Sequence, residues 1–225
     1  MRGIMINSKG RDIDNMDQNV HAVRRAQAEA CMIRLEANQF ETQYFDNSSD
    51  ALSFLKKAIP ADSTVGVGGS ETLRQIHAIE WLENEPSLKF LDRYHAGNEE
   101  QVLRDSLTAD VFLTSSNAVT MNGMLYNVDG RGNRIAALTF GPKKVYVLVG
   151  TNKIVSDIDA AVQRVKTIAA PANCMRLKRQ TPCTKTGECM ECSYDQTICS
   201  SYAVTRRSHI KNRICVIFIN EELGF

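Results

Sequence analysis

Hydrophobic positions along the chain follow two alternating patterns. Apolar residues recur every three or four positions in several stretches, as on a helix with one buried face. Between these stretches lie short continuous apolar runs, which are typical of strands covered on both faces. Strands that alternate with helices predict a mostly parallel sheet with helices on both faces, an α/β fold. The predicted strands are 43–45, 64–67, 110–114, 145–149 and 214–219, and the predicted helices are 14–40, 48–58, 70–82, 98–107, 132–140 and 156–170.

The longest helical stretch, residues 14–40, has apolar positions that step by three and four. We expect these positions to form its buried face. Ser48 or Ser49 and Ser156 are the expected N-caps of later helices, and Pro171 is expected to end the last one. The apolar positions of the first helix are Val20, Val23, Ala26, Ala30, Ile33, Ala37 and Phe40.

Two stretches depart from the alternation. Residues 115–133 are rich in polar side chains and glycine, which favours a loop at the edge of the sheet. Residues 171–212 hold most of the cysteines and no regular pattern. The sequence therefore predicts an N-terminal arm (1–14), an α/β core (15–170), a cysteine-rich segment (171–212) and a C-terminal strand that returns to the core (213–225).

Composition narrows the classes of protein. The 225 residues suit one domain with a sizeable core and an appendage. A formal net charge of +1 gives no electrostatic case for binding nucleic acid or an anionic membrane. No apolar run reaches the length that spans a bilayer, and residues 1–10 are too polar for a signal peptide. We expect a cytoplasmic protein that neither inserts into a membrane nor binds nucleic acid.

A glycine-rich turn follows the second predicted strand, at residues 64–73. Gly66, Gly68 and Gly69 would leave the backbone open to a ligand and permit positive φ. Ser70 is the expected N-cap of the next helix, whose first amides would attract phosphates or carboxylates. The spacing matches neither G-x-G-x-x-G nor the Walker A motif, so it specifies no particular nucleotide. A plain turn capped by Ser70 remains an equal alternative.

Other polar residues follow other predicted strands, and the carboxyl ends of parallel strands meet in one crevice. Asp129 is a candidate catalytic base there, although Asp-Gly is also a common turn signal. Arg131, Arg134, Lys143 and Lys153 are candidates to pair with an anionic ligand. The predicted ligand-binding residues are Gly66, Gly68, Gly69, Ser70, Thr72, Ser115, Asn117, Asn127, Asn133, Arg134, Asn152 and Lys153.

Four of the seven cysteines lie within seventeen residues, with five, two and six residues between them. Such crowding favours a metal centre over buried packing thiols, disulfides or unligated thiols. The compact spacing favours an iron–sulfur cluster somewhat over zinc, which usually takes two separated pairs. Cys31 and Cys215 are expected in the core, and Cys174 is expected to be structural. The predicted metal ligands are Cys183, Cys189, Cys192 and Cys199.

Several motifs in fixed order resemble the lactate-utilisation-domain (LUD) family, in its cysteine-containing subgroup of short bacterial members. The resemblance extends from about residue 15 to the C-terminus. It implies a fold like that of ribose-5-phosphate isomerase, glucosamine-6-phosphate deaminase and CoA-transferase. It also implies a link to oxidation of lactate to pyruvate by several subunits acting together. The motifs that carry it lie at residues 66–73, 114–118, 127–134, 150–153, 183–199 and 220–224.

Two functions follow from these residues and the resemblance. The leading hypothesis is an accessory redox subunit in oxidation of lactate or a related 2-hydroxy acid, with redox partner subunits and the cluster as an electron relay. The alternative is an enzyme or sensor that binds a small anionic metabolite, such as a sugar phosphate or acyl thioester, with a structural metal at the cysteines. Whether the chain is itself an enzyme stays open. A brown protein that bleaches on reduction would favour the relay.

Overall fold

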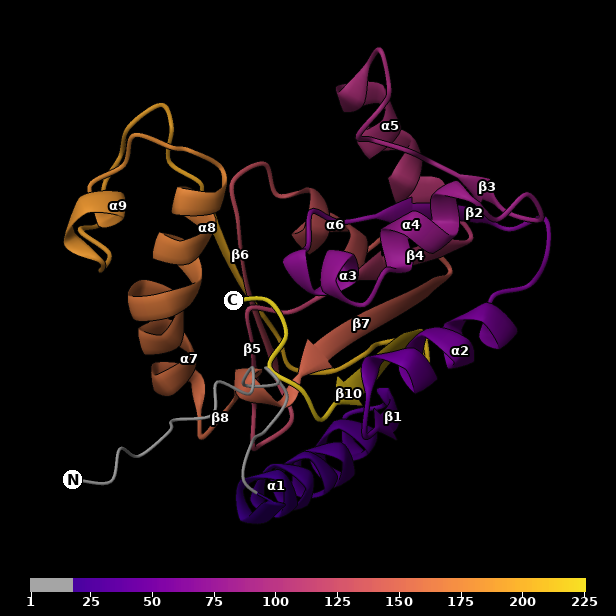
Figure 1. Ribbon diagram of the computed structural model, residues 1–225, viewed down its shortest axis with the longest axis horizontal. Helices are drawn as coiled ribbons and strands as arrows, with labels where there is room; N and C mark the ends of the chain where they lie inside the picture. Colours follow the sequence, from indigo (N-terminus) through magenta and orange to yellow (C-terminus); the bar gives the residue numbers. More distant parts are fainter. Residues whose placement is uncertain (1–17) are drawn as a thin grey trace, which may run out of the picture.

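The computed structural model describes residues 18–225, so the predicted N-terminal arm (1–14) lies outside the described residues. Its main sheet has six strands in the order β1-β10-β7-β4-β2-β3, and every neighbouring pair is parallel (Figure 1). The α/β prediction is confirmed. The strands of this sheet are β1 (Glu41–Phe45), β2 (Thr64–Val67), β3 (Lys89–Phe90), β4 (Val111–Thr114), β7 (Lys144–Gly150) and β10 (Ile214–Ile219).

Three helices cover one face of the main sheet and form a hydrophobic core with it. Leu55, Leu73 and Leu82 from these helices are buried against Leu113 and Leu148 of the central strands. The continuous apolar runs of the strands explain this arrangement, because a strand covered on both faces has no polar side to alternate. The helices are α2 (Ser48–Ala58), α3 (Glu71–Gln75) and α4 (Ala78–Glu83), and α5 (Glu99–Asp105) follows β3 in the chain.

A second sheet covers the other face together with α1 and α6. Residues 115–133 were predicted to be a loop, but they contain two strands of this sheet, so that prediction is wrong. The order is β8-β5-β6-β9, with β6 antiparallel to both of its neighbours. The elements are α1 (Gln18–Ala37), β5 (Ala118–Thr120), β6 (Leu125–Asp129), α6 (Asn133–Thr139), β8 (Ile154–Val155) and β9 (Ser201–Thr205).

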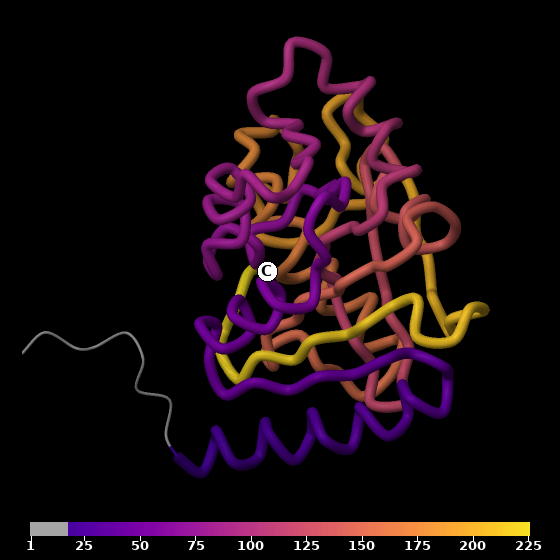
Figure 2. The backbone as a smooth tube through the Cα atoms, turned by 90° about the vertical axis from the view of Figure 1, so that its right-hand side faces the viewer, coloured from indigo at the N-terminus to yellow at the C-terminus, as the bar shows by residue number. Residues whose placement is uncertain are grey.

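The buried face of α1 is not the predicted one. Helix α1 lies along β1 and β10 (Figure 2) and buries Ala28, Cys31 and Leu35. Val23 and Ile33, which were predicted to be inside, are exposed. The helix comes so close to the 120–124 turn that a Cβ on Gly123 would lie 2.7 Å from the carbonyl carbon of Arg34. Glycine at position 123 therefore allows the close approach of α1 to this turn.

The helix that follows β8 does not stop at Pro171. Segment α7 (Ile158–Arg164) continues through a π-helical turn (Val165–Ala169) into α8 (Ala170–Arg176). Pro171 sits in the first turn of α8, where its missing N–H is tolerated. This continuous helical run packs on the outer face of the second sheet.

Two predicted caps are also corrected. Asn47, rather than Ser48 or Ser49, caps α2 and accepts a hydrogen bond from Asp50 N. Asp157, rather than Ser156, caps α7 and accepts one from Ala160 N. Asn, Asp and Ser are about equally good N-cap residues, so residue type alone could not select among these neighbours. Within residues 18–225, no helix is both long and apolar enough to cross a membrane.

Candidate functional site

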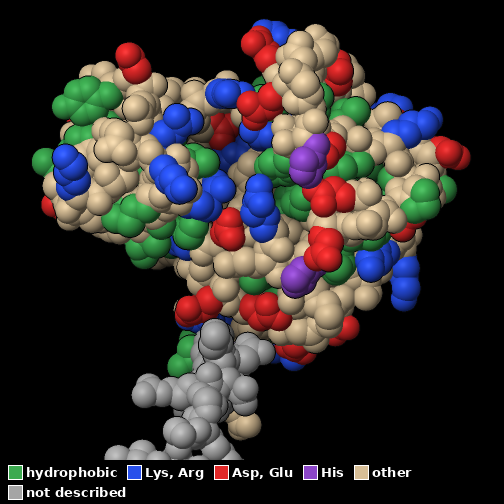
Figure 3. All heavy atoms as spheres, turned by 45° about the horizontal axis from the view of Figure 1, so that its top comes forward, with side chains coloured by type: hydrophobic (Ala, Val, Ile, Leu, Met, Phe, Trp, Pro, Cys, Tyr) green, Lys and Arg blue, Asp and Glu red, His purple; other side chains and the backbone are tan. Residues whose placement is uncertain are grey.

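A pocket of about 650 Å³ lies at the carboxyl-end edge of β2 and β4. Figure 3 shows Lys and Arg side chains gathered around the hollow on this face. Its polar lining comes from the glycine turn, the end of β4, the β6–α6 turn, α8 and the cysteine-rich segment. Predicted ligand-binding residues that line it are Gly69, Ser70, Ser115, Asn117, Asn133, Arg134 and Lys153, together with the predicted catalytic residue Asp129.

The glycine turn serves close packing and not positive φ. Gly66, Gly68 and Gly69 are not among the residues with positive φ, so that part of the prediction is wrong. A Cβ on Gly66 would lie 2.7 Å from Ser106 Cβ, and one on Gly68 would lie 2.9 Å from Arg134 Cγ. Gly69 has more room, because its Cβ would meet only Arg93 Nη1 at 3.5 Å. The absence of a side chain at Gly68 therefore leaves the space that Arg134 of the pocket occupies.

Ser70 caps α3 as predicted, accepting a hydrogen bond of 3.2 Å from Leu73 N. The helix is only five residues long and carries Glu71 in its first turn. A helix this short gives a small dipole, and the carboxylate opposes a second anion. The positive character of the pocket must therefore come mainly from side chains.

Arg134 is held in place by a network on the pocket wall. Its Nε donates to Asp129 Oδ1 at 2.6 Å, and its Nη2 donates to Val128 O at 2.6 Å and to Asn117 Oδ1 at 3.1 Å. Asp129 Oδ2 accepts from Ile135 N at 2.9 Å. Both oxygens of Asp129 are thus engaged in fixing Arg134 and the start of α6. In this arrangement the carboxylate positions the guanidinium.

Lys153 lies at the floor of the pocket and is only 3% exposed. Its Nζ donates to Thr72 Oγ1 at 2.9 Å and to Ser115 Oγ at 3.0 Å. No carboxylate among residues 18–225 forms an ion pair with it. Burial, with added effects of the charges on Arg164 and Arg134, lowers the pKa of Lys153 from 10.5 to about 7. An unpaired buried ammonium is costly, so this site favours either a neutral amine or a bound anion.

Arg164 is a buried cation near Lys153 that the sequence did not indicate, although it does not line the pocket. It is 8% exposed, and its guanidinium donates to the carbonyl oxygens of Asn117 (2.7 Å) and Asn152 (3.3 Å). Burial lowers the pKa of Arg164 to about 10. An arginine in an amphipathic helix normally faces solvent, so the pattern gave no signal for this one. It adds a second buried cation beside Lys153.

Some predicted residues lie away from the pocket. Gly66 packs inside β2, and Asn152 uses its side-chain oxygen to accept from Leu223 N. Asn127 is completely buried in β6, and neither polar atom of its side-chain amide has a hydrogen-bond partner among the described residues. Lys143 pairs with Asp110 where β4 begins, at the opposite edge of the sheet, so its prediction as a crevice residue is wrong.

The rim of the pocket is rich in arginine. Glu99 bridges Arg93 (2.6 Å) and Arg131 (3.0 Å), while Arg176 of α8 lies 3.9 Å from Glu71. Residues 195–198 and Ser200, from the cysteine-rich segment, close one side. The segment is therefore a wall of the pocket, which the sequence alone could not place.

All seven cysteines are free thiols. Cys31 and Cys215 are fully buried in separate cores, which confirms their predicted place. Cys183 is buried, whereas Cys189, Cys192 and Cys199 are half-buried. A different group, Glu83, Asp92 and His95, brings three potential metal ligands within 4.8 Å at the surface. Its carboxylates and imidazole also pair with one another, as exposed groups commonly do.

These features define an α/β protein with a pocket lined by several cationic side chains at the carboxyl edge of a parallel sheet. The model of the LUD domain matches residues 28–219, and the chain belongs to this family. The LUD family is associated with lactate utilisation, and the chain shares this association as a member of the family.

Comparison with solved structures supports the fold. A DUF162 family protein from Deinococcus radiodurans is similar with a TM-score of 0.50 and 14% identity, covering 89% of this chain and 98% of that one. The eIF2B delta protein from Chaetomium thermophilum gives a TM-score of 0.36 at 15% identity, covering 67% and 60%, which is too low to support an argument. No protein of curated function matches the sequence.

Proposed function

We propose that the chain binds a small anionic metabolite in the pocket, with Lys153 at its floor, and that it acts in the oxidation of lactate or a related 2-hydroxy acid. Binding of a small anionic metabolite is the alternative hypothesis drawn from the sequence. A role in the oxidation of 2-hydroxy acids extends the association of the family with lactate utilisation. The anion class is a carboxylate or a phosphate, because both accept hydrogen bonds from ammonium and guanidinium groups.

The observation that carries this proposal is the environment of Lys153. Two hydroxyl groups account for two of its three ammonium protons, and the charges that perturb it are those of Arg164 and Arg134. A bound anion would compensate this excess of positive charge, and binding would be favourable because the cations are already fixed. Arg134 is held by Asp129 and Asn117, so little side-chain entropy is lost when a ligand binds.

Isothermal titration calorimetry at pH 6.5 tests the proposal with lactate, pyruvate, a sugar phosphate and acetyl-CoA. The expected result is saturable binding of one of these, lost in Lys153→Met. Lys143→Met is the matched control, because Lys143 is an exposed lysine at the opposite edge of the sheet. If none of the four binds, or if Lys153→Met binds as well as the wild type, the assignment of this pocket is wrong.

A second role, as an accessory redox subunit, is favoured by one observation. The cysteine-rich segment contributes residues 195–198 and Ser200 to the pocket wall, so Cys199 lies between two pocket residues in the chain. A redox centre there would be next to a 2-hydroxy acid bound in the pocket. Short distance is what electron transfer between a substrate site and partner subunits requires. Reduction of an anaerobically prepared chain by its partner subunits in the presence of lactate would test this role.

A further inference from the structure

The side-chain amine of Lys153 is held by hydrogen bonds and lines the pocket although it is almost completely buried. The hydroxyl groups of Thr72 and Ser115 accept from Nζ at 2.9 and 3.0 Å. A Cβ on Gly224 would lie 3.0 Å from Nζ, so the C-terminal segment covers a further side of the amine. The third position on Nζ has no hydrogen-bond partner among residues 18–225, and a ligand in the pocket can occupy it.

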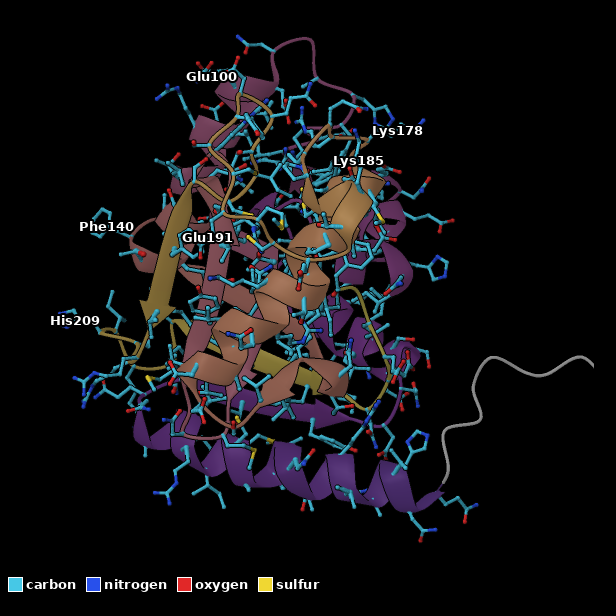
Figure 4. All side chains as sticks on the ribbon, turned by 90° about the vertical axis from the view of Figure 1, so that its left-hand side faces the viewer. Glu100, Phe140, Lys178, Lys185, Glu191 and His209 are labelled. Carbon is cyan, nitrogen blue, oxygen red and sulfur yellow. The ribbon has the colours of Figure 1, made fainter. Side chains whose placement is uncertain are left out.

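The surroundings of Lys153 favour the neutral amine, the form in which lysine is a nucleophile. Burial lowers the pKa of Lys153 to about 7, and the charges of Arg164 and Arg134 add to the shift. The helical run from α7 to α8 lies over this side of the second sheet (Figure 4). It brings Arg164 to Asn152, the residue before Lys153, where Arg164 Nε donates to Asn152 O at 3.3 Å. Burial beside another cation is a setting that activates a lysine for addition to a carbonyl group.

Arg134 contacts the same serine as Lys153. Its Nη1 donates to Ser115 O at 3.4 Å, while the Ser115 hydroxyl accepts from Lys153 Nζ. The Nε and Nη2 atoms of Arg134 are engaged on the pocket wall. The second proton of Nη1 has no acceptor among the described residues, so it can donate to a bound carboxylate. Ser115 thus joins a group that binds carboxylate to a group that attacks carbonyl carbon.

A 2-oxo acid carries both complementary groups on adjacent carbon atoms. Its carboxylate accepts hydrogen bonds from a guanidinium, and its ketone carbon accepts the lone pair of an amine. A 2-hydroxy acid has the same carboxylate, but its alcohol carbon does not react with an amine. The chemistry of Lys153 and Arg134 therefore distinguishes the oxidised acid from the reduced one.

We propose that Lys153 forms an iminium with the carbonyl group of a 2-oxo acid whose carboxylate is bound by Arg134. This inference rests on the proposed function, because a 2-oxo acid is the product of oxidising a 2-hydroxy acid. The ligand class in the pocket is thereby narrowed to the oxidised acid.

The reaction balances without an oxidant or a reductant. The lone pair of neutral Nζ forms the new C–N bond, and the carbonyl oxygen takes up two protons and leaves as water. In total, an ammonium and a ketone give an iminium and water. A hydroxyl group both accepts and donates, so Ser115 can relay a proton between Nζ and the departing oxygen. The iminium keeps the positive charge that compensates the bound carboxylate.

The test is reductive trapping of the full chain with pyruvate and sodium cyanoborohydride at pH 7, followed by peptide mapping. Reduction of the iminium should add the mass of pyruvic acid less one oxygen atom to the peptide that contains Lys153. Lactate has an alcohol in place of the ketone and serves as the reagent blank, which should add no mass. Lys178 and Lys185, labelled in Figure 4, are internal controls that should stay unmodified, because both are exposed and neither lines the pocket.

Two variants and a second carbonyl compound sharpen the test. Lys153→Met should not be labelled, whereas Lys143→Met, which removes an exposed lysine at the opposite edge of the sheet, should be labelled like the wild type. Acetone has the ketone without the carboxylate. It should label Lys153 at least about tenfold more slowly than pyruvate, because it loses the charged hydrogen bond to Arg134. Equal rates for the two compounds would overturn the contact with Arg134.

The iminium is overturned if pyruvate leaves the chain unlabelled, or if it labels Lys178 and Lys185 as readily as Lys153. Calorimetry on the same samples separates this failure from that of the proposed function. Pyruvate that binds in a Lys153-dependent way without being trapped would refute the iminium and leave anion binding in place. Absence of binding by any of the anions would refute both.

Discussion

Gly68 and Arg134 are in such close contact that a single methyl group on Gly68 would lie 2.9 Å from Cγ and 3.0 Å from Cδ of the arginine. These atoms are near the base of a side chain whose tip is fixed by Asp129, Asn117 and Val128. The arginine cannot move aside without losing those bonds. The glycine turn and the β6–α6 turn therefore form one unit.

Gly68→Ala should consequently displace Arg134 and weaken anion binding by about tenfold or more, since even one lost charged hydrogen bond costs about 1.5–3 kcal/mol. Gly69→Ala is the control, because its Cβ would meet only the tip of Arg93 at 3.5 Å. Titration calorimetry of the two variants measures the difference. Equal binding by both would mean that Arg134 does not contact the anion.

The lowered pKa of Lys153 should make the free energy of unfolding depend on pH. Its pKa is about 7 in the folded chain and near 10.5 when unfolded, so the unfolded chain binds more protons between these values. The free energy of unfolding of the wild type, relative to Lys153→Met, should therefore rise with pH across this window by about 1.4 kcal/mol per unit. Urea denaturation at pH 7, 8 and 9 measures it. Below pH 7 the difference should be constant.

Lys143→Met supplies the contrast for that experiment. A hydrogen bond from Lys143 to Asp110 raises the pKa of this lysine, and the carboxylate charge adds to the shift. The contribution of Lys143 is thus fully present below the unfolded pKa and is lost only above it. The difference in the free energy of unfolding between the wild type and Lys143→Met should not change from pH 7 to pH 9. A flat profile for Lys153→Met as well would contradict the depressed pKa of Lys153.

Anion affinity should fall as pH rises above about 7, because the ligand requires the ammonium form of Lys153. Each further unit should weaken binding up to about tenfold, as the free protein must first take up a proton. Calorimetry in two buffers of different ionisation enthalpy should detect this proton uptake at pH 8. Affinity that is constant from pH 6 to pH 9 would show that Lys153 does not bind the anion.

Asp129→Asn should destabilise the fold and lower anion affinity together. The side chains of Asp129 and Arg134 are 4% and 13% exposed, and removing one partner of such a buried pair costs about 3 kcal/mol or more. Glu100→Gln removes a carboxylate from an exposed pair with Arg104 and should leave the stability close to that of the wild type. Chemical denaturation compares them. If Asp129→Asn keeps stability and affinity but loses turnover of an identified substrate, Asp129 is a general base after all.

The main sheet could be predicted because its central strands are uninterrupted apolar runs that can be recognised in the sequence. Val145–Val149 and Ile214–Ile219 are apolar without interruption, and β7 and β10 lie side by side at the centre. Strands β5 and β6 could not be recognised, because Asn127, Asp129 and other polar residues occupy buried positions there. Asp129 is tolerated there because Arg134 and Ile135 N satisfy its carboxylate, whereas Asn127 is buried without a hydrogen-bond partner among the described residues, and a hydrophobic pattern reports neither.

The candidate site could also be predicted only in part. Ser115 and Lys153 could be assigned to one crevice because each follows a strand of the parallel sheet, and both line the pocket. The burial of Arg164 near Lys153 could not be predicted, since it lies on a helix whose direction and rotation depend on packing against the second sheet.

The π-helical turn at residues 165–169 has a consequence for this helix. A π turn holds more residues than an α turn, so every later side chain falls roughly 100°, or about one residue, behind its place in an uninterrupted α-helix. Downstream of it, Asn173 and Arg176 line the pocket while Cys174 is buried. The π turn thus sets the rotation at which this helix directs Asn173 and Arg176 to the pocket and buries Cys174.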